Sequence, residues 1–371
     1  MKIEQLLIKQ ISIAQVSDEI NWENLELENL INETWWRIEK MVFTTNPRNW
    51  NEIPHYLLRI WRSWKHIWFV SHWDVVSYWE WWETIPNEWT EKDGFIYWRW
   101  ACDMLWWVAA QILAWKEIAE AWKMLSIFLP WDEETESDWI QELIKANDVP
   151  LDYIIWWEPT SNIIAWDAIK IWRRGRVHWE IIFEWAQFHT AYINSQNWIN
   201  LTKLLVEWFF KEIIWSYDNW VGKMPATSFA IRNIRMDDLW WNTVPWKIIL
   251  SFDARISSVW WQETFKLELE KRLDKLKINY DLILWRWTDP YFTEDSDFIN
   301  KISKSIEKVN WVIPEINCEW WTSDCRFFWK IWIPTIEVWL ENSTIHKPNE
   351  RQSIENLERL KNIYIQIWKD L

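Results

Sequence analysis

The sequence predicts an α/β protein in which a larger domain, a β-sheet with helices on both faces, is interrupted by an inserted α+β domain. Three observations predict this fold class. Short apolar runs alternate with helical patterns in the first part of the chain, the order of elements changes in the middle, and the alternation returns toward the C-terminus. The 371 residues are enough for two hydrophobic cores.

In the first part of the chain, apolar runs predict strands, and apolar residues spaced three or four apart predict helices. The predicted elements are a strand at 66–76, a helix at 108–125, a strand at 126–129, a helix at 138–146 and a strand at 153–155. Strands that alternate with helices favour a sheet covered by helices on its faces.

The middle of the chain has a different order: strand 177–184, helix 199–214, strands 228–236 and 247–256, helix 263–276 and strand 280–284. Strand, helix, strand, strand, helix, strand is typical of a ferredoxin-like α+β layer. The last part returns to helix 296–309, strand 335–338 and helix 353–370. We therefore expect a first domain segment at 1–174, an inserted domain at 175–288 and a second segment of the first domain at 289–371.

The composition contains 44 Trp and only 3 Gly, which inverts ordinary usage. Many Trp occur as adjacent pairs at turn-like junctions, where glycine is favoured for positive φ or close backbone approach. Our hypothesis is that most of them are glycines encoded by UGA, a codon that some bacterial lineages translate as glycine. UGG codons at Trp98, Trp100, Trp106 and Trp107 would contradict it.

Charge and targeting signals narrow the class of protein. Apolar residues make up 50% and charged residues 26%, which excludes a disordered chain, and the net charge of −15 argues against a nucleic-acid partner. The N-terminal residues read as an amphipathic helix and not as a signal peptide, and no run suits a membrane span. Three cysteines without a CxxC motif fit a reduced compartment, so we expect a cytoplasmic protein.

Histidines and carboxylates follow the predicted strands. Each of them alone is more typical of a surface pair, an acidic loop or a helix cap, but together they indicate a metal site. Mixed imidazole and carboxylate ligands suit Zn²⁺, with Co²⁺ or Mn²⁺ as substitutes, and a bridging carboxylate can hold two ions for hydrolysis. The candidate residues are His72, Asp74, Asp103, Glu133, Glu134, Glu158 and His346.

Ten segments occur in order along nearly the whole chain: HWDVV, YWRWACDM, DEET, WEPTS, RRGR, WAQFHTAY, NTVP, FDAR, WWTSDCRF and NSTIHKPNE. Their joint occurrence resembles the M20 family of zinc amidohydrolases and peptidases. The resemblance implies a zinc-peptidase-like catalytic domain with a mixed sheet, two Zn²⁺ per subunit, and hydrolysis of an amide in a small N-acylated amino acid. It also implies that the inserted domain is a lid that forms a homodimer.

The same resemblance implies a role for each candidate residue. His72 and Glu158 would bind one zinc, Glu134 and His346 the other, and Asp103 would bridge the two. Glu133 would be the general base, and Asp74 would orient His72. His189 would reach the partner subunit's active site and stabilise the oxyanion.

Substrate selection is expected to rest on arginine, whose fork binds carboxylates in a bidentate manner. The positions that resemble substrate contacts are Arg173, Asn242, Arg255, Thr322 and Asn342. The segments NSTIHK and TSDCRF favour removal of a succinyl group over deacetylation of N-acetylornithine or carboxypeptidase activity. Glu158 favours the acyl-removing branch of the family over the aminopeptidase branch, which tends to have Asp at this position. Deacetylation of N-acetylornithine and dipeptide cleavage are the alternatives within the family. A non-catalytic binding protein would lack a ligand or the base, and none is missing here.

The sequence departs from the family pattern at Phe188, Leu105, Ser77 and Cys325. None of these departures removes a predicted ligand. Phe188 stands directly before His189 in place of a small residue, so it bears on the oxyanion loop and on the identity of the substrate.

Overall fold

The computed structural model describes part of the chain. The described residues are 38–45, 52–60, 66–72, 77, 81–86, 88–99, 101–102, 104, 110–111, 114, 118, 124–129, 137, 139–147, 150–156, 160–161, 166–184, 188–189, 191, 208–214, 217–222, 224–236, 241–317, 323–338, 340–341 and 343–371.

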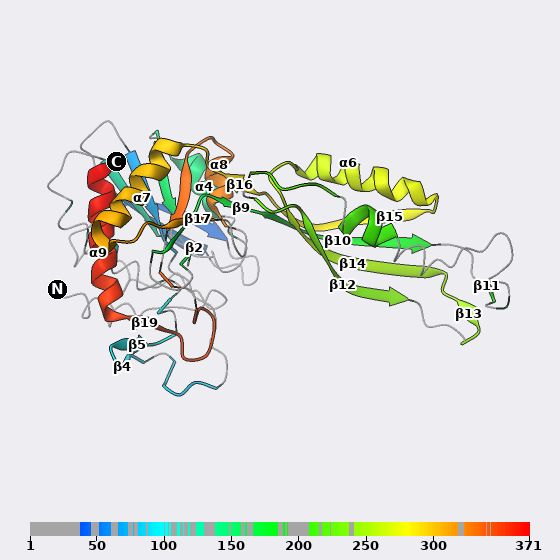
Figure 1. Cartoon of the computed structure of the whole chain (residues 1–371), viewed down its shortest axis with the longest axis horizontal. Helices are drawn as coiled ribbons and strands as arrows, with labels where there is room; N and C mark the ends of the chain where they lie inside the picture. The colour runs from blue at the N-terminus through cyan, green and yellow to red at the C-terminus, as the bar shows by residue number, and fades with distance from the viewer. Residues whose placement is uncertain are drawn as a thin grey trace. The chain divides into compact units, whose positions relative to one another are not determined.

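Two compact units make up the chain (Figure 1). The first comprises Met1–Ile171, Thr293–Asn317 and Ser323–Leu371, and the second comprises Trp172–Phe292 and Cys318–Thr322. Among the described residues, no helix has both the length and the apolar character needed to cross a membrane.

The first unit is built on an eight-stranded mixed sheet in the order β1-β2-β6-β3-β7-β18-β8-β17. Strands β6, β3, β7 and β18 run parallel to one another, whereas β1, β2 and β6 are joined by antiparallel pairing. The strands are β1 (Ile38–Thr45), β2 (Glu52–Ile60), β3 (His66–Val70), β6 (Met124–Leu129), β7 (Tyr153–Trp156), β8 (Ala168–Lys170), β17 (Glu315–Asn317) and β18 (Thr335–Val338).

Helices cover both faces of this sheet. Neighbouring residues of a strand point to opposite faces, and in β3 the ring of Trp68 contacts Phe328 of α8 (Cys325–Trp329), while the ring of Phe69 contacts Tyr364 of α9 (Ile354–Asp370). Helix α7 (Ser296–Asn310) packs along α9. The α/β class with a mixed sheet is therefore confirmed. Every residue of β3 is buried, as expected for a strand covered on both faces.

Two predicted boundaries were wrong. The strand expected at 66–76 ends at Val70, because the backbone N–H of His72 leaves the sheet ladder and donates to the Met104 sulfur at 2.9 Å. The helix expected at 108–125 must end before Met124, where β6 begins. The described helical positions in that segment, at 110, 111, 114 and 118, are all buried and lie on one helical face.

The other predicted elements of the first unit lie close to the observed ones. Helix α4 (Trp139–Ala146) and helix α7 begin and end within one residue of the expected helices, and β18 has the expected bounds. A small three-stranded sheet was not predicted. It pairs β19 (Arg351–Ser353) with β5 (Phe95–Tyr97), and β5 with β4 (Thr90–Lys92).

The second unit contains a four-stranded antiparallel sheet in the order β12-β14-β10-β15. Its elements follow the chain order β10 (Gly175–Glu184), η3 (Phe209–Ile214), β12 (Ser228–Met236), β14 (Lys247–Ile256), α6 (Gln262–Leu273) with the turn η4 (Asp274–Leu276), and β15 (Tyr280–Thr288). Burial alternates along β10, so one face of the sheet forms the core and packs against Phe265, Leu269 and Leu273 of α6. Figure 1 shows α6 lying along this sheet.

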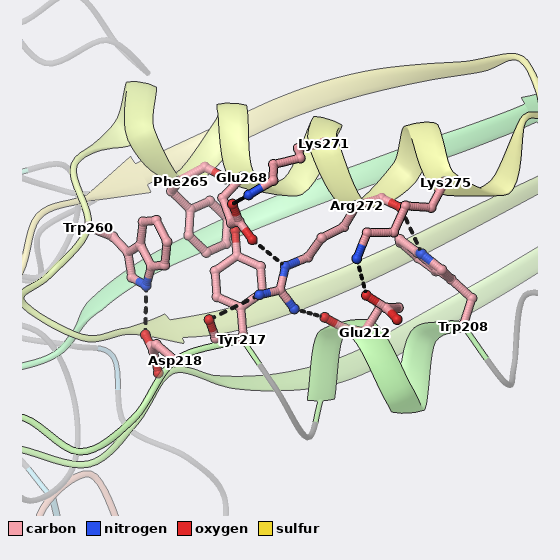
Figure 2. Close-up of polar contacts among 10 residues, drawn as sticks. All are labelled: Trp208, Glu212, Tyr217, Asp218, Trp260, Phe265, Glu268, Lys271, Arg272 and Lys275. Atoms are coloured by element: carbon pink, nitrogen blue, oxygen red, sulfur yellow. Dashed lines mark hydrogen bonds and ion pairs between the residues drawn. The ribbon is translucent and has the colours of Figure 1, made fainter.

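Arg272 of α6 joins the two helical segments of the second unit (Figure 2). Its guanidinium lies over the ring of Tyr217, 4.6 Å from the centroid, and its Nε donates to Glu268 at 2.8 Å. It also donates to the backbone carbonyls of Glu212 and Tyr217. Because the side chain is buried, these contacts provide the partners that a buried guanidinium requires.

Several tryptophans have a backbone conformation that is unusual for a bulky residue. Nine described non-glycine residues have positive φ, and four of them are tryptophans: Trp81, Trp166, Trp311 and Trp332, with φ of 80°, 64°, 61° and 64°. Asp and Asn tolerate this region, whereas a bulky side chain there is an outlier. Two of the three glycines, Gly94 and Gly222, also have positive φ.

Candidate functional site

The parallel strands of the first unit bring their carboxyl ends to one edge of the sheet. Val70 at the end of β3 is in register with Phe128 of β6 and with Trp156 of β7, and Trp156 is in register with Glu337 of β18. Ligands of α/β sheets bind at this edge. His72 and Glu158 each follow two residues after a paired strand end, and Glu133 and Glu134 follow β6.

Part of the predicted site lies outside the described residues, namely Asp74, Asp103, Glu133, Glu134, Glu158, Thr322 and Asn342. Among the residues that the structure does describe, no group of three or more His, Cys, Asp or Glu side chains forms a metal site. The complete ligand set therefore stays a prediction.

His72 is fully buried just beyond β3. Its backbone N–H contacts Met104, the residue that follows Asp103 in sequence. A buried carboxylate, Asp324, faces His72 closely enough for the two charges to interact. Burial raises the pKa of Asp324, and Arg326, whose Nη1 lies 2.6 Å from Asp324 Oδ1, opposes the shift together with Ser137 and His72. Asp324 was not predicted as a site residue, although it lies in the motif TSDCRF.

His346 lies in the loop between β18 and β19, and its side chain is exposed. Its φ of 55° is in the left-handed region, where histidine is enriched among non-glycine residues. The neighbouring Lys347 donates its backbone N–H to the Thr344 carbonyl at 3.2 Å and its Nζ to the Ser343 carbonyl at 2.8 Å. These bonds close a compact turn around His346.

The loops that contain Asp103 and His346 are joined by a buried contact. Arg99 Nη1 lies 2.9 Å from Glu350 Oε2, and the backbone N–H of Cys102 donates to Glu350 Oε1 at 2.7 Å. Both charged side chains are fully buried. The first unit thus brings the segment directly before Asp103 against the segment directly after His346, although 251 positions separate Arg99 from Glu350.

In the second unit, His189 and Asn242 lie together. Strand β11 (Phe188–His189) pairs with β13 (Thr243–Val244), and the Asn242 amide lies 2.8 Å from His189 Nε2. The backbone N–H of Ala191 donates to His189 Nδ1 at 3.1 Å. Asn242 Nδ2 is the atom that faces Nε2, and which group donates in this contact depends on the tautomer of the ring.

The predicted arginine positions are both in the second unit. Arg173 is buried in β9 (Trp172–Arg173), which pairs with β16 (Tyr291–Phe292). Arg255 lies on β14 directly opposite Arg176 of β10. Arg176 Nε and Nη2 both donate to Asp253 Oδ2, at 2.9 and 2.7 Å. Within the part of the chain that the structure describes, the Arg255 guanidinium makes no hydrogen bond or ion pair.

The surroundings of Arg255 are electropositive. Burial lowers the pKa of Arg255, the nearby Arg176 and Arg174 lower it further, and Asp253 opposes them. Gly175 precedes Arg176 at a close approach of two strands, where an added Cβ would lie 2.4 Å from the Thr288 carbonyl oxygen. A side chain at that position would push apart the strands that hold the arginines. In this cluster the positive charges of Arg174, Arg176 and Arg255 outnumber the single negative charge of Asp253.

Comparison with known proteins gives a consistent result. A model of peptidase family M20/M25/M40 matches residues 68–370. The succinyl-diaminopimelate desuccinylase of a Nitratiruptor species is 32% identical over 309 residues, which cover 82% of this chain and 84% of that protein. The enzymes of the same name from Sulfurimonas denitrificans and Bordetella avium are 30% and 31% identical, again over 82% of this chain and over 84% and 82% of their own lengths.

Solved structures share the fold at low sequence identity. Aminopeptidase PepT from Bacillus cereus aligns with a TM-score of 0.72 and 14% identity, covering 100% of this chain and 99% of its own. A dinuclear metal-binding peptidase of the M20 family from Bacillus subtilis aligns with a TM-score of 0.66 and 12% identity, covering 98% and 97%.

Proposed function

Since the chain belongs to peptidase family M20/M25/M40, we propose that it is a metal-dependent amide hydrolase that converts N-succinyl-LL-2,6-diaminopimelate and water into succinate and LL-2,6-diaminopimelate. The observation that carries this proposal is the agreement of several relatives with this activity in their names, at 30 to 32% identity over four-fifths of the chain. The reaction would supply precursors of lysine and of the cell wall.

The proposed metal centre lies at the carboxyl edge of β6, β3 and β7. A buried imidazole, His72, stands at this edge, and the sequence places carboxylates directly after the neighbouring strands. This donor set fits two Zn²⁺, with Co²⁺ or Mn²⁺ as substitutes. His72 and Glu158 would hold one ion, Glu134 and His346 the other, with Asp103 between them. When bound, the ions would polarise the scissile carbonyl and make a water more acidic.

The chain's own residues would move the protons. Glu133 would take a proton from the attacking water and return it to the leaving amine, and Asp74 would hold the imidazole of His72 in its ligating orientation. His189 would donate from Nε2 to the oxyanion in the partner subunit's site. The contacts of Ala191 with Nδ1 and of Asn242 with Nε2 support this role, because they hold the ring in one orientation.

Recognition of the succinyl carboxylate would rest on Arg255. Its guanidinium is half-buried, and Asp253 already pairs with Arg176. A substrate carboxylate would provide the missing counter-charge through two parallel hydrogen bonds. Arg173, Asn242, Thr322 and Asn342 would complete the contacts with the substrate.

The inserted domain, which we place at 175–288, would be a ferredoxin-like lid that also forms a homodimer. Along the chain these strands follow the order β10, β12, β14 and β15, whereas in the sheet they lie in the order β12-β14-β10-β15. This difference between chain order and sheet order supports the ferredoxin-like assignment. Strand β12 is an edge strand that exposes Ile231, Ile234 and Met236. An exposed apolar edge strand is suited to pairing with the same strand of a second copy.

A second candidate is another hydrolase of the family, such as an acetylornithine deacetylase or a dipeptidase. Human carnosine dipeptidase 1 has the same fold, with a TM-score of 0.65 at 15% identity, and a shared fold is compatible with either activity. The arginine cluster around Arg255 favours the succinyl substrate, because a succinyl group ends in a free carboxylate and an acetyl group does not.

The test measures succinate release from N-succinyl-LL-2,6-diaminopimelate by the zinc-loaded protein, with N-acetylornithine as the comparison substrate. Turnover of the succinyl substrate that a chelator abolishes is the expected result. A zinc-loaded protein that turned over only the acetyl substrate would keep the metal chemistry and overturn the substrate assignment.

A further inference from the structure

A fully buried ion pair that the proposed mechanism does not use joins two distant segments of the first unit. Arg99 and Glu350 are both 0% exposed, with Nη1 and Oε2 2.9 Å apart. Taking two charges out of water is expensive, and a pair of apolar residues of the same volume is often as stable. Arg99 Nε and Nη2 have no hydrogen-bond partner among the described residues, and the guanidinium lies over the ring of Trp82, 5.1 Å from its centroid.

The two oxygens of Glu350 make different contacts. Oε2 meets Arg99, and Oε1 accepts the backbone N–H of Cys102 at 2.7 Å. Cys102 is the residue before Asp103 in sequence, and Met104, the residue after it, accepts the backbone N–H of His72. Both chain neighbours of the predicted bridging carboxylate are therefore held by hydrogen bonds, one of them through Glu350.

Further contacts attach the loop that contains His346. The backbone N–H of Trp98 donates to the Glu350 carbonyl at 3.1 Å, and Cys102 Sγ lies 3.3 Å from Thr344 Oγ1. Thr344 is two residues before His346, and Glu350 is four residues after it. The loop that contains His346 is thus attached at both ends to the segment that precedes Asp103.

We propose that Glu350, held by Arg99, is a positioning residue that sets the segment containing Asp103 against the loop containing His346. The inference rests on the proposed metal centre, in which these two residues share an ion. A carboxylate fits this position because its two oxygens can satisfy a backbone N–H and a guanidinium at once. A residue that acts in this way changes how tightly the ion is held, in addition to the stability of the unit.

The test compares Glu350→Gln with the unchanged full-length protein. Zinc affinity is measured by competition with a chromogenic chelator, kcat and KM with the succinyl substrate, and stability by thermal unfolding of the metal-free protein. Loss of a partner that supports metal ligands weakens metal affinity by about 10- to 100-fold. We expect a loss of this size, a fall in kcat and little change in KM.

The matched control is Glu268→Gln in the second unit, which removes the carboxylate that Arg272 Nε contacts at 2.8 Å. It should lower the melting temperature and leave zinc affinity unchanged. Arg99→Lys keeps the positive charge opposite Glu350 and should retain more zinc affinity than Arg99→Met. The difference in zinc affinity between Arg99→Lys and Arg99→Met also tests the proposal if Glu350→Gln does not fold.

A Glu350→Gln protein with reduced stability but unchanged zinc affinity and kcat would overturn the inference, as would equal zinc affinity of Arg99→Lys and Arg99→Met. The unchanged protein tests the proposed function separately. If it binds zinc without hydrolysing the succinyl substrate, the substrate assignment fails and the affinity comparison still decides the positioning role. If it binds no zinc, both fail.

A second inference concerns the backbone conformation of Trp311 and of three other tryptophans. Trp311 is the residue after α7, with φ of 61° and ψ of 20°, and its backbone N–H donates to the Glu307 carbonyl at 2.8 Å. This is the left-handed end of a helix, at which glycine is preferred. Its side chain is 90% exposed, so no packing compensates for the strained backbone.

Two of the other left-handed tryptophans lack compensating packing as well. Trp332 is 87% exposed and Trp81 86% exposed. Trp166 is fully buried, and its indole Nε1 has no hydrogen-bond partner among the described residues. We infer that Trp81, Trp166, Trp311 and Trp332 stand where the polypeptide made in the cell has glycine.

The codons and the protein itself test this second inference. We expect UGA at these four positions in the gene, and glycine in tandem mass spectra of peptides that span positions 311 and 332 of protein from its source cells. The peptide around Gly94 serves as the control, since it should contain glycine from an ordinary glycine codon. UGG codons, or peptides with tryptophan at 311 and 332, would overturn it.

Discussion

Arg255 of β14 faces Arg176 of β10 across the antiparallel register of the second unit, and the Asp253 carboxylate accepts its hydrogen bonds from Arg176. Two guanidinium groups in opposed positions repel each other unless an anion joins them. Arg255 is therefore expected to bind the carboxylate of the succinyl group, and its replacement should impair binding of the substrate more than any step of the chemistry.

We predict that Arg255→Ala raises KM for N-succinyl-LL-2,6-diaminopimelate by about 10- to 100-fold, because a hydrogen bond to a charged group contributes roughly 1.5–3 kcal/mol. Steady-state kinetics measure this. Arg286→Ala, which removes an exposed arginine from β15 of the same sheet, should leave KM unchanged. An Arg255→Ala protein with unchanged KM would assign the carboxylate to another residue.

A second prediction concerns catalysis across the proposed dimer. His189→Ala should lower kcat by about 10²- to 10³-fold through loss of the oxyanion donor. If His189 acts in the partner subunit's site, mixing His189→Ala with Glu133→Gln subunits creates one complete site in each mixed dimer. Recovery of roughly a quarter of the original activity after subunit exchange is expected. Without recovery, the oxyanion donor would act within its own subunit.

The proposed base has a prediction of its own. Glu133→Gln keeps the size of the side chain and removes the proton acceptor, so kcat should fall by about 10²- to 10⁴-fold. Zinc content, measured by atomic absorption, should stay close to that of the unchanged protein, because Glu133 is not among the proposed ligands. Unchanged turnover would assign the base to a different residue.

The local spacing of apolar residues decided which elements of the fold could be predicted from the sequence. Periodicity predicted α7, β18 and the long strands of the second unit, because each element has a buried face of regular spacing. It missed β1 and β2, where a proline at position 54 and interspersed charges weaken the strand pattern. It also extended β3 to residue 76, since nothing local shows that His72 turns toward Met104.

The same distinction applies to the candidate site: local motifs identified some of its residues, but not the contacts between distant segments. The motifs identified His72, which is buried at a strand end, and also Arg255 and the pair His189 and Asn242, which the structure places together. They did not identify Glu350 as the partner of Arg99. That contact joins positions 251 apart in the chain, so only the three-dimensional fold reveals it.

Glu180 of β10 provides a test of pH dependence. Ser251 donates a hydrogen bond at 2.6 Å and is the main cause of the lowered pKa of Glu180; burial opposes it, and Arg235 adds to it. A carboxylate whose pKa is lower in the folded state stabilises the fold above its unfolded pKa, near 4.5, and this contribution is lost as pH falls through the folded pKa.

The free energy of unfolding should therefore decrease less steeply below pH 4.5 in Glu180→Gln than in the unchanged protein. Urea denaturation from neutral pH into this range measures the difference. Glu263→Gln, in the exposed first turn of α6, is the control and should follow the unchanged protein. An equally steep decrease in Glu180→Gln would show that other carboxylates dominate acid unfolding.

The last prediction follows from the end of α7. Left-handed backbone costs a residue with a side chain about 1–2 kcal/mol, and glycine avoids this cost. Trp311→Gly should therefore stabilise the first unit by about 1 kcal/mol, seen as a melting temperature a few degrees higher. Trp285→Gly is the matched control, because Trp285 is also exposed but lies within β15, where glycine weakens a strand. The two substitutions should thus shift stability in opposite directions, and a loss of stability in both would show that the αL conformation at position 311 does not favour glycine.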